Sequence, residues 1–374
     1  MKVIINAASI FKGGAEQVVN SFINECRNIE GNEYHIFLCD NILSGLGSIE
    51  FPKNFYFYKL DQRPATSLFH LYKSLRYFDQ LEKKICPDVV ISTGGHGYWR
   101  PKAPLLTGFN IPHYVYPESP YFRIIPKRKR IYWKIKKQFD LCFYKRSDAI
   151  IVQTDDVKKR VEKLLPKSRV FTVSNTINSV FLNPPNLNNK LPDKKQADEI
   201  RLLTVSANYP HKNIKIIKNV LDALFMMGKN HIQFVLTLPE DVFNQIFLEK
   251  YRPYVFNVGP VSIKEVPALY NECDLMFLPS LLECFSASYV EAMAMEKPII
   301  TSDLGFARHI CGEAAVYFDP LDGKNIAEKI IQVSNNDAIK KKLTESGKDY
   351  LQSINSPYER AVSFLKISRS LIKK

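Results

Sequence analysis

The stretch DLMFLPSLLECFSASYVEAMAMEKPIITSD, residues 274–303, predicts a buried strand, a turn, an amphipathic helix over 286–295 and a second strand. Glu283 lies in the turn, and Glu291 lies about two helical turns inside the predicted helix. Backbone N–H groups at a helix N-terminus hold phosphate, and carboxylates accept hydrogen bonds from sugar hydroxyls. The stretch therefore predicts a site for a polyhydroxylated, anionic ligand.

The same alternation of short β-rich runs and helical stretches continues along the whole chain. Near-continuously apolar strands between helices indicate parallel sheets covered on both faces, hence the α/β class with two Rossmann-like doubly wound domains facing across a cleft. Strands are predicted at 2–6, 34–39, 88–92, 149–153, 170–174, 201–206, 232–238, 274–279 and 298–302. Helices are predicted at 15–27, 68–84, 155–165, 214–227, 264–273, 286–295 and 325–334.

The alternation pauses at residues 183–199, NPPNLNNKLPDKKQADE. Three prolines, several asparagines and mixed charge predict a solvated linker between an N-terminal domain, 1–182, and a C-terminal domain, 200–352. Residues 353–374 contain an amphipathic helix that we expect to cross back onto the first domain. Ligands should bind beyond the carboxyl ends of the strands, in the cleft between the two halves.

Composition narrows the class of protein. The chain has 374 residues, of which 45% are hydrophobic and 24% charged, as in a globular protein. No apolar run approaches the roughly 20 residues of a membrane-spanning helix, and the N-terminus shows no signal-peptide cleavage site and predicts a first strand. Seven cysteines without a CxxC pair indicate reduced thiols, so a cytoplasmic location is expected.

The net charge of +14 favours anionic partners, and the excess is concentrated at residues 123–146. Ten basic residues accompany the single acid Asp140 there, with Trp, Tyr, Phe and Ile interleaved. This pattern suits the headgroup region of an anionic bilayer, and it equally suits a surface helix with one core face and one solvated face. No nucleic-acid-binding motif accompanies the charge, so no nucleic acid is expected as a partner.

Two strand-to-helix turns add candidate phosphate contacts. Gly13 and Gly14 follow the first strand, where glycines let backbone N–H groups approach a ligand closely, although a simple tight turn explains them too. The pattern does not match GxGxxG. Lys212, in ANYPHKN, begins the helix predicted from about Ile214 and can bind a diphosphate there; the alternative is a solvated surface lysine.

Histidines supply candidate catalytic groups. His96, in STGGHGYW, and His113, in FNIPHYVYPESP, are candidates to line the cleft of the first domain, although a lone histidine more often has a structural role. The sequence has no H-x-x-H spacing for zinc, no Asp-x-Asp triplet and no G-x-S-x-G elbow, so neither a metal nor a cofactor is expected.

Several of these segments together resemble the retaining glycosyltransferases of family 4 (glycosyl transferases group 1), which have the GT-B fold. The likeness spans nearly the whole chain: GGAEQVV is similar to the N-terminal glycine loop, PHKN to the phosphate-binding lysine segment, and E-x7-E with PS and EAMA to the family signature. VSNTINSVF is similar to the end of the first domain, and AAVYFDPLDGKNIAEKI to the segment after the glutamates.

The resemblance implies a role for each matching residue. Glu291 would accept hydrogen bonds from the nucleotide ribose, and Glu283 would contact donor-sugar hydroxyls beside the anomeric carbon. His113 is our choice for the catalytic histidine of the first domain, with Tyr116 as the alternative. The segments expected to hold the diphosphate contain Gly13, Gly14, Lys212, Asn213, Ser286 and Ala287.

Three positions depart from the family pattern. The usual E-G-F-G turn is Glu283-Cys284-Phe285-Ser286 here, which leaves the identity of the donor sugar open. Glu296 replaces a glycine at the end of the helix, and Ser206 stands where many members carry an arginine. Tyr209 or His211 could assist Lys212 in place of that arginine.

The sequence therefore predicts a metal-independent hexosyltransferase that moves a sugar from a nucleotide-diphosphate donor to a glycan or lipid-linked acceptor in surface-polysaccharide biosynthesis. Acceptor binding is assigned to the first domain and donor binding to the second. The expected location is cytoplasmic and peripheral on the inner face of the plasma membrane. Two alternatives remain: a sugar-nucleotide epimerase or hydrolase of the same fold, and a non-catalytic protein that binds anionic glycan or nucleic acid.

Overall fold

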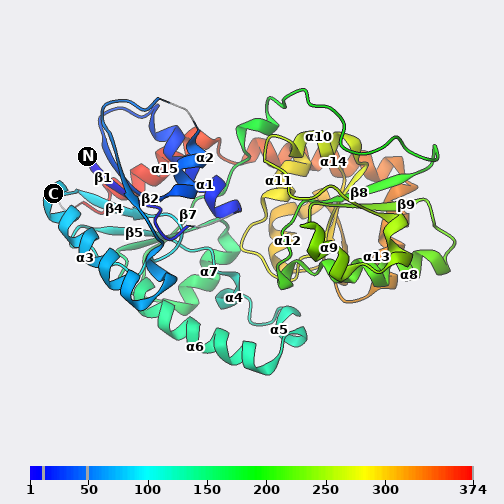
Figure 1. Cartoon of the computed structure of the whole chain (residues 1–374), viewed down its shortest axis with the longest axis horizontal. Helices are drawn as coiled ribbons and strands as arrows, with labels where there is room; N and C mark the ends of the chain where they lie inside the picture. Colours follow the sequence, from blue (N-terminus) through cyan, green and yellow to red (C-terminus); the bar gives the residue numbers. More distant parts are fainter. Residues whose placement is uncertain (11–12, 48–49, 373–374) are drawn as a thin grey trace. The chain divides into compact units, whose positions relative to one another are not determined.

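The computed structural model describes residues 1–10, 13–47 and 50–372, and it divides into two compact units (Figure 1). Unit 1 comprises Met1–Val115, Pro126–Thr176 and Asn355–Lys374, and unit 2 comprises Tyr116–Ile125 and Ile177–Ile354. Each unit is built on one parallel sheet, so the prediction of two doubly wound α/β halves is confirmed. Residues 116–125 fall inside the predicted first domain in sequence but belong to unit 2.

The sheet of unit 1 has the strand order β3-β2-β1-β4-β5-β6-β7 in the described residues. Side chains alternate between its faces: Val3 and Ile5 of β1 pack in one core cluster and Ile4 in another. Helices therefore cover both faces, which makes the sheet doubly wound. The strands are β1 (Lys2–Asn6), β2 (Glu33–Cys39), β3 (Phe55–Leu60), β4 (Val89–Ser92), β5 (Leu105–Gly108), β6 (Ala149–Val152) and β7 (Val170–Thr172).

The longer helices of unit 1 follow the apolar periodicity of their sequences. The helix α3 begins after Ser67, whose hydroxyl accepts the His70 N–H, and it buries Phe78, Leu81 and Ile85. Unit 1 contains α1 (Gly14–Cys26), α2 (Asp40–Leu46), α3 (Leu68–Ile85), α4 (Pro112–Val115), α6 (Lys127–Tyr144), α7 (Asp155–Leu164), α15 (Pro357–Arg369) and the 3₁₀ turn Pro64–Thr66.

The C-terminal helix α15 packs in unit 1, beside α1 at the opposite end of the chain (Figure 1). A capping box fixes its start, since the Ser356 hydroxyl accepts the Glu359 N–H and the Glu359 carboxylate accepts the Ser356 N–H. Phe364 meets Phe22 of α1 with ring centroids 5.1 Å apart. The last helix of the chain thus completes the core under the first strand.

The sheet of unit 2 has the order β10-β9-β8-β11-β12-β13 in the described residues, and all its pairs are parallel. Met276 of β11 pairs with Leu203 of β8 on one side and with Ile299 of β12 on the other. These central strands are almost entirely buried, as their continuous apolar runs predict. The strands are β8 (Ile200–Thr204), β9 (Ile232–Leu236), β10 (Val255–Asn257), β11 (Leu275–Leu278), β12 (Ile299–Ser302) and β13 (Ala315–Phe318).

Two helix starts in unit 2 differ from the prediction. The helix expected from about Ile214 begins as a 3₁₀ turn, and its α-helical part starts at Ile217. The helix of the glutamate motif starts at Ala287, so Glu291 is its fifth residue and lies little more than one turn inside. The helices are α5 (Tyr121–Ile124), α8 (Ile217–Met226), α9 (Glu240–Ile246), α10 (Val266–Glu272), α11 (Ala287–Ala294), α12 (Gly305–Cys311), α13 (Gly323–Ser334) and α14 (Asp337–Ser353), with 3₁₀ turns at Ser179–Phe181, Pro210–Lys212, Ile214–Ile216, Glu249–Tyr254 and Gly312–Ala314.

The proline- and asparagine-rich segment 183–199 contains no helix or strand, and most of its residues are exposed. It is nevertheless tied to unit 2, because the Glu272 carboxylate accepts the backbone N–H groups of Lys190, at 2.9 Å, and of Leu191, at 2.6 Å. Lys194 forms an ion pair with Asp274 over 2.8 Å. Among the helices of the described residues, none is both long enough and apolar enough to cross a membrane.

Candidate functional site

The donor-binding residues predicted in the C-terminal half follow neighbouring strands at the carboxyl edge of the unit 2 sheet. Lys212 lies in the loop after β8, and Glu283 lies in the turn after β11, the neighbouring strand. The two loops are joined directly, since the Leu281 N–H donates to the His211 carbonyl over 2.7 Å. Adjacent parallel strands end at the same edge, so this placement follows from the sheet order.

Lys212 and Glu283 form an ion pair, with 2.5 Å between Nζ and Oε1. Their side chains are only 15% and 12% exposed, so each charge depends on the other for compensation. A diphosphate that enters beside Lys212 would offer the ammonium a second, stronger anion. Lys212 is therefore a candidate anion-binding residue, with Glu283 as its partner in this structure.

Glu291 differs from Glu283 in its surroundings. Within the described residues its carboxylate makes no hydrogen bond or ion pair, although only 6% of the residue is exposed. Burial raises the pKa of Glu291 to about 7, and the nearby Lys212 charge opposes that shift. A buried acceptor without a donor is costly unless a ligand satisfies it, which singles out Glu291 as a binding group.

The N-terminus of α11 follows directly after the turn that carries Glu283. Ser286 occupies the N-cap position but its side chain makes no capping hydrogen bond, and Ala287 begins the helix. The Tyr289 N–H donates to the Ser286 carbonyl over 3.2 Å. The N–H groups of Ala287 and Ser288 come before the first possible intrahelical acceptor, so they are the ones that can face an anion. Cys284 and Ser286, which replace the family's glycines, are both buried.

Asn213 and the aromatic residues before it shape the Lys212 loop. Asn213 has a left-handed backbone with φ of 55°, and its amide donates to the Pro320 carbonyl over 2.8 Å, so this side chain anchors the loop. Tyr209 and His211 stack with ring centroids 5.6 Å apart. Burial lowers the pKa of His211, with Glu283 opposing the shift, so Lys212 is the principal cation of the loop near neutral pH.

Gly13, Gly14 and His113 belong to unit 1 and lie at the carboxyl edge of its own sheet. Gly13 has a φ of 75° just before α1, and a side chain added at either glycine would meet no atom within 4 Å. His113 stacks on Trp133 of α6 with ring centroids 3.7 Å apart. The alternative residue Tyr116 lies in unit 2, where its ring is 6.1 Å from that of Phe306.

A buried polar cluster around Asp140 in unit 1 is not predicted from the sequence. The fully buried Asp140 carboxylate accepts hydrogen bonds from Tyr114 at 2.6 Å and Lys136 at 2.7 Å, and His96 Nε2 lies 3.4 Å away. Burial acts to raise the pKa of Asp140, but the His96, Lys136 and Tyr114 contacts bring it down to about 2. The one available signal is that Asp140 is the single acid in a basic segment.

The structure thus brings Lys212, Glu283, Ser286 and Glu291 together on one unit, and it places the two glycines and His113 on the other. His96 is engaged with Asp140 and is 6% exposed, which favours the structural role for this histidine. Across the described ranges, no group of three or more His, Cys, Asp or Glu side chains is placed to hold a metal ion.

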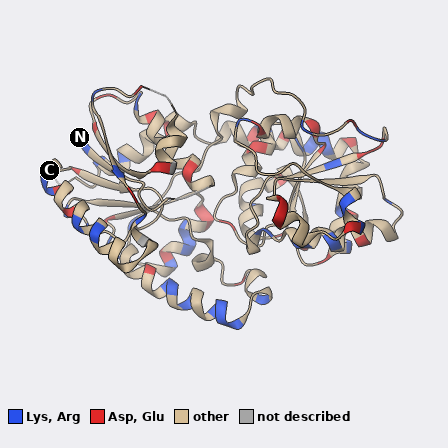
Figure 2. Ribbon diagram, in the orientation of Figure 1, with Lys and Arg blue, Asp and Glu red and all other residues tan. Residues whose placement is uncertain are grey.

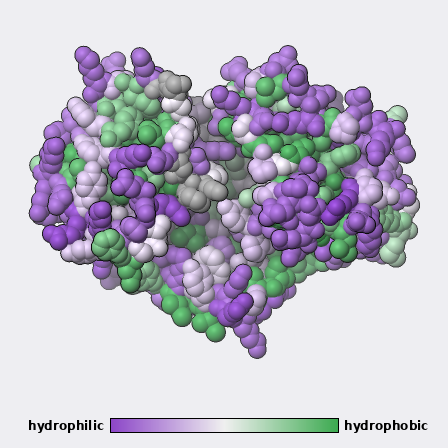
Figure 3. Space-filling view, viewed as in Figure 1, coloured by the Kyte–Doolittle hydropathy of each residue, from purple (hydrophilic) through white to green (hydrophobic). Residues whose placement is uncertain are grey.

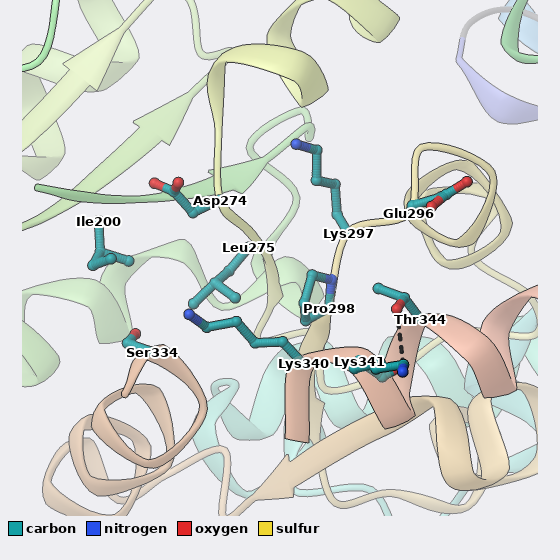
Figure 4. A pocket seen from close by; sticks show the side chains of 10 residues that line it. All are labelled: Ile200, Asp274, Leu275, Glu296, Lys297, Pro298, Ser334, Lys340, Lys341 and Thr344. Atoms are coloured by element: carbon teal, nitrogen blue, oxygen red, sulfur yellow. Dashed lines mark hydrogen bonds between the residues drawn. The ribbon is translucent and has the colours of Figure 1, made fainter. Parts of the chain in front are cut away.

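A separate hollow of about 310 Å³ lies at the opposite edge of the same sheet, where β8, β11 and β12 begin (Figure 4). Its two carboxylates are already paired, Asp274 with Lys194 and Glu296 with Lys348. Ligands of doubly wound sheets bind beyond the carboxyl ends of the strands, so this hollow is distinct from the candidate site.

Two family models match the chain, one in each half. The model described as "Glycosyltransferase Family 4" matches residues 12–180, and the model described as "Glycosyl transferases group 1" matches residues 188–350. The second match contains Lys212, Glu283 and Glu291, and the first contains Gly13, Gly14 and His113.

Individual curated proteins match part of the chain at low sequence identity. The chain is 25% identical over 231 residues to the O-antigen chain mannosyltransferase RfbU of Salmonella typhimurium, a match that covers 59% of this chain and 58% of that protein. The chain spans about half the length of the curated relatives it matches.

Solved structures match the fold over nearly the full chain. A sucrose-phosphate synthase from Thermosynechococcus elongatus has a TM-score of 0.76 at 16% identity, with 99% of both chains covered. HepE from Anabaena, solved with UDP and glucose, has a TM-score of 0.72 at 16% identity, with 99% of this chain and 100% of that chain covered.

Proposed function

This chain belongs to the group 1 glycosyltransferases of family 4, with the GT-B fold, and on that premise we propose that it is a retaining, metal-independent hexosyltransferase that uses a nucleotide-diphosphate sugar. The observation that carries the proposal is the combination of the Lys212–Glu283 ion pair, the unpartnered Glu291 carboxylate and the uncapped start of α11. Together they supply a cation and N–H donors for phosphate and carboxylate acceptors for hydroxyls.

In this proposal each group has its own part of the donor. Glu291 accepts hydrogen bonds from the ribose hydroxyls, which gives its buried carboxylate the donors that the described residues do not provide. Lys212 and the first turn of α11 bind the diphosphate. Gly13 and Gly14, in unit 1, are proposed as backbone donor-binding positions because a side chain added at either would meet no atom within 4 Å. Glu283, released from Lys212, turns its carboxylate to hydroxyls of the donor sugar.

Transfer then breaks the bond between the anomeric carbon and the diphosphate oxygen, and the electron pair leaves with the diphosphate. The acceptor hydroxyl oxygen attacks the same face of the sugar, and its proton passes to the departing phosphate oxygen. Negative charge grows on the diphosphate in the transition state, so Lys212 and the helix pole stabilise it electrostatically. We assign His113 to the first-domain contact with the reacting sugar.

The second part of the proposal concerns the acceptor and the membrane. One relative is an O-antigen chain mannosyltransferase, and we infer a glycan or lipid-linked glycan acceptor in surface-polysaccharide biosynthesis. On α6, the residues Ile131, Tyr132, Ile135 and Phe139 are each more than half exposed. Lys and Arg positions recur along the same helix (Figure 2), so α6 would rest on the anionic inner face of the plasma membrane.

The helix α3 supports the membrane proposal independently. Leu68, Phe69 and Tyr72 are 86%, 70% and 60% exposed, and Lys73 and Arg76 stand among them. Figure 3 shows hydrophobic side chains on the surface of this part of unit 1, over α3 and α6. Exposed aromatic and aliphatic groups beside cations match the boundary between headgroups and acyl chains.

A donor panel tests the function. Nucleoside diphosphate release is measured from UDP-, GDP-, ADP- and dTDP-sugars, with and without a membrane-extracted glycolipid acceptor. A transferase releases diphosphate from one donor faster when acceptor is present, and NMR of the product shows the anomeric configuration of the donor. Conversion of the sugar without diphosphate release would identify an epimerase, acceptor-independent release a hydrolase, and binding without turnover a non-catalytic protein.

A further inference from the structure

Residues 116–125 leave unit 1 and pack as part of unit 2. The chain enters unit 2 at Tyr116, directly after α4, and returns to unit 1 at Pro126, directly before α6. The segments directly before and after the excursion belong to unit 1, so its own contacts place it in unit 2.

Ser119 makes the central contact of the excursion. Its hydroxyl donates to the Leu281 carbonyl over 2.6 Å and accepts the Tyr121 N–H over 3.1 Å. Ser119 is 5% exposed and Leu281 is fully buried, so water does not compete for this hydrogen bond. The hydroxyl thus ties the excursion to the turn that carries Glu283 two residues later.

The neighbouring contact reaches the other loop of the donor site. The Tyr121 ring lies edge-on to the His211 ring, with centroids 6.3 Å apart, and His211 immediately precedes Lys212. The Leu281 N–H donates to the His211 carbonyl over 2.7 Å. The excursion, the Lys212 loop and the Glu283 turn therefore meet at one buried junction, and Leu281 uses both its N–H and its carbonyl there.

We propose that residues 116–125 are a positioning segment of the donor site, in which Ser119 and Tyr121 fix the Glu283 turn and the Lys212 loop relative to each other. The inference rests on the proposed function, because it assumes that Lys212 and Glu283 bind the donor. Ser119 itself touches neither donor nor reacting atoms; it acts through the Leu281 backbone. Loss of its hydroxyl leaves the Leu281 carbonyl unsatisfied and lets the turn shift.

The test compares Ser119→Ala with Ser368→Ala. Ser368 is the matched control, since its hydroxyl is fully buried and donates to the Phe364 carbonyl over 2.8 Å in α15, within unit 1. We expect Ser119→Ala to raise the donor KM about tenfold, which corresponds to one lost hydrogen bond, while the acceptor KM and the kcat change little. Ser368→Ala should leave both KM values at the wild-type level.

A second readout needs no ligand. Hydrogen exchange should quicken in peptides that cover residues 207–213 and 279–286 of Ser119→Ala and stay unchanged there in Ser368→Ala. If Ser119→Ala unfolds, Ser119→Cys replaces it, because the thiol is similar in volume and is a weak donor. This variant should show the same increases in donor KM and in hydrogen exchange, but smaller ones. Equal donor KM and equal exchange in the two alanine variants would overturn the inference.

A third variant separates this inference from the proposed function. Lys212→Ala must raise the donor KM if the donor site is correctly assigned, whatever Ser119 does. A normal donor KM in Lys212→Ala would refute the site, whereas a raised KM in Lys212→Ala with a normal one in Ser119→Ala would refute only the positioning role.

Discussion

At the scale of a single residue, Glu291 combines burial with an ionisable carboxyl group. A carboxylate that is 6% exposed and has no donor among the described residues opposes folding when it is ionised. Its folded pKa of about 7 lies above the ordinary value of 4.5. The contribution of this group to stability is therefore fully present below the unfolded pKa and is lost as the pH rises through about 7.

Glu291→Gln removes that ionisation and keeps the shape of the side chain. We expect the variant to gain about 2–3 kcal/mol over the wild type at pH 8 and to gain little at pH 4. The measurement is urea unfolding at both pH values. Glu296→Gln, at an exposed residue of the same segment, is the control and should show no such pH dependence. An equal effect of Glu291→Gln at the two pH values would mean that Glu291 is ordinary surface charge.

The Lys212–Glu283 pair allows a double-mutant cycle. Lys212→Met and Glu283→Gln each leave one largely buried charged or polar partner unpaired, so each should destabilise the protein by about 2 kcal/mol. The double variant should lose less than the sum, with a coupling of at least about 1 kcal/mol. Thermal and urea unfolding of the four proteins measure the cycle; strict additivity would show that the two side chains do not interact.

At the scale of elements, the strands that could be predicted are those with continuous apolar runs. β1, β2, β11 and β12 match their predicted ranges within about a residue. The edge strand β3 was missed because FYFYKL mixes buried and exposed positions, and β5 was missed because its apolar run is only Leu105–Gly108. A continuous apolar run indicates a strand that is buried on both faces of a sheet. This signal is weak for edge strands and for very short strands.

Part of the candidate site could also be predicted from the sequence. Carboxyl ends of adjacent parallel strands bring Lys212 and Glu283 to one edge, so their proximity follows from strand order. The Ser119 junction and the Asp140 cluster did not follow, because both depend on side chains from segments distant in sequence. A single serine or aspartate forms no repeating sequence pattern, so the sequence gives no signal for such a contact.

The membrane contact proposed for the helix α6 can be tested by removing its basic residues. Replacing Lys127, Arg128, Lys129 and Arg130 with serine should reduce co-sedimentation with vesicles that contain phosphatidylglycerol by at least tenfold, since each cation near an anionic surface contributes about 1 kcal/mol. Replacing four lysines of α14, Lys340, Lys341, Lys342 and Lys348, removes the same charge and should have little effect. Equal binding by the two variants would remove α6 from the membrane contact.

At the scale of the whole molecule, a chain of net charge +14 folds into two parallel-sheet units, each built from segments that are not contiguous in the sequence. Unit 1 is completed by the last helix of the chain, and unit 2 includes a loop that lies between two helices of unit 1 in sequence. Truncation at a linear domain boundary would therefore remove part of a core, and the functional experiments require the full chain.

The most direct test compares the donor kcat/KM of Lys212→Ala with that of Lys348→Ala. Lys348 belongs to unit 2, lies away from the candidate site and forms an ion pair with Glu296 at 2.9 Å. If Lys212 stabilises the departing diphosphate, its loss should lower kcat/KM for the accepted donor by at least about a hundredfold, and Lys348→Ala should match the wild type. Wild-type kcat/KM in Lys212→Ala would contradict the assignment of the donor site.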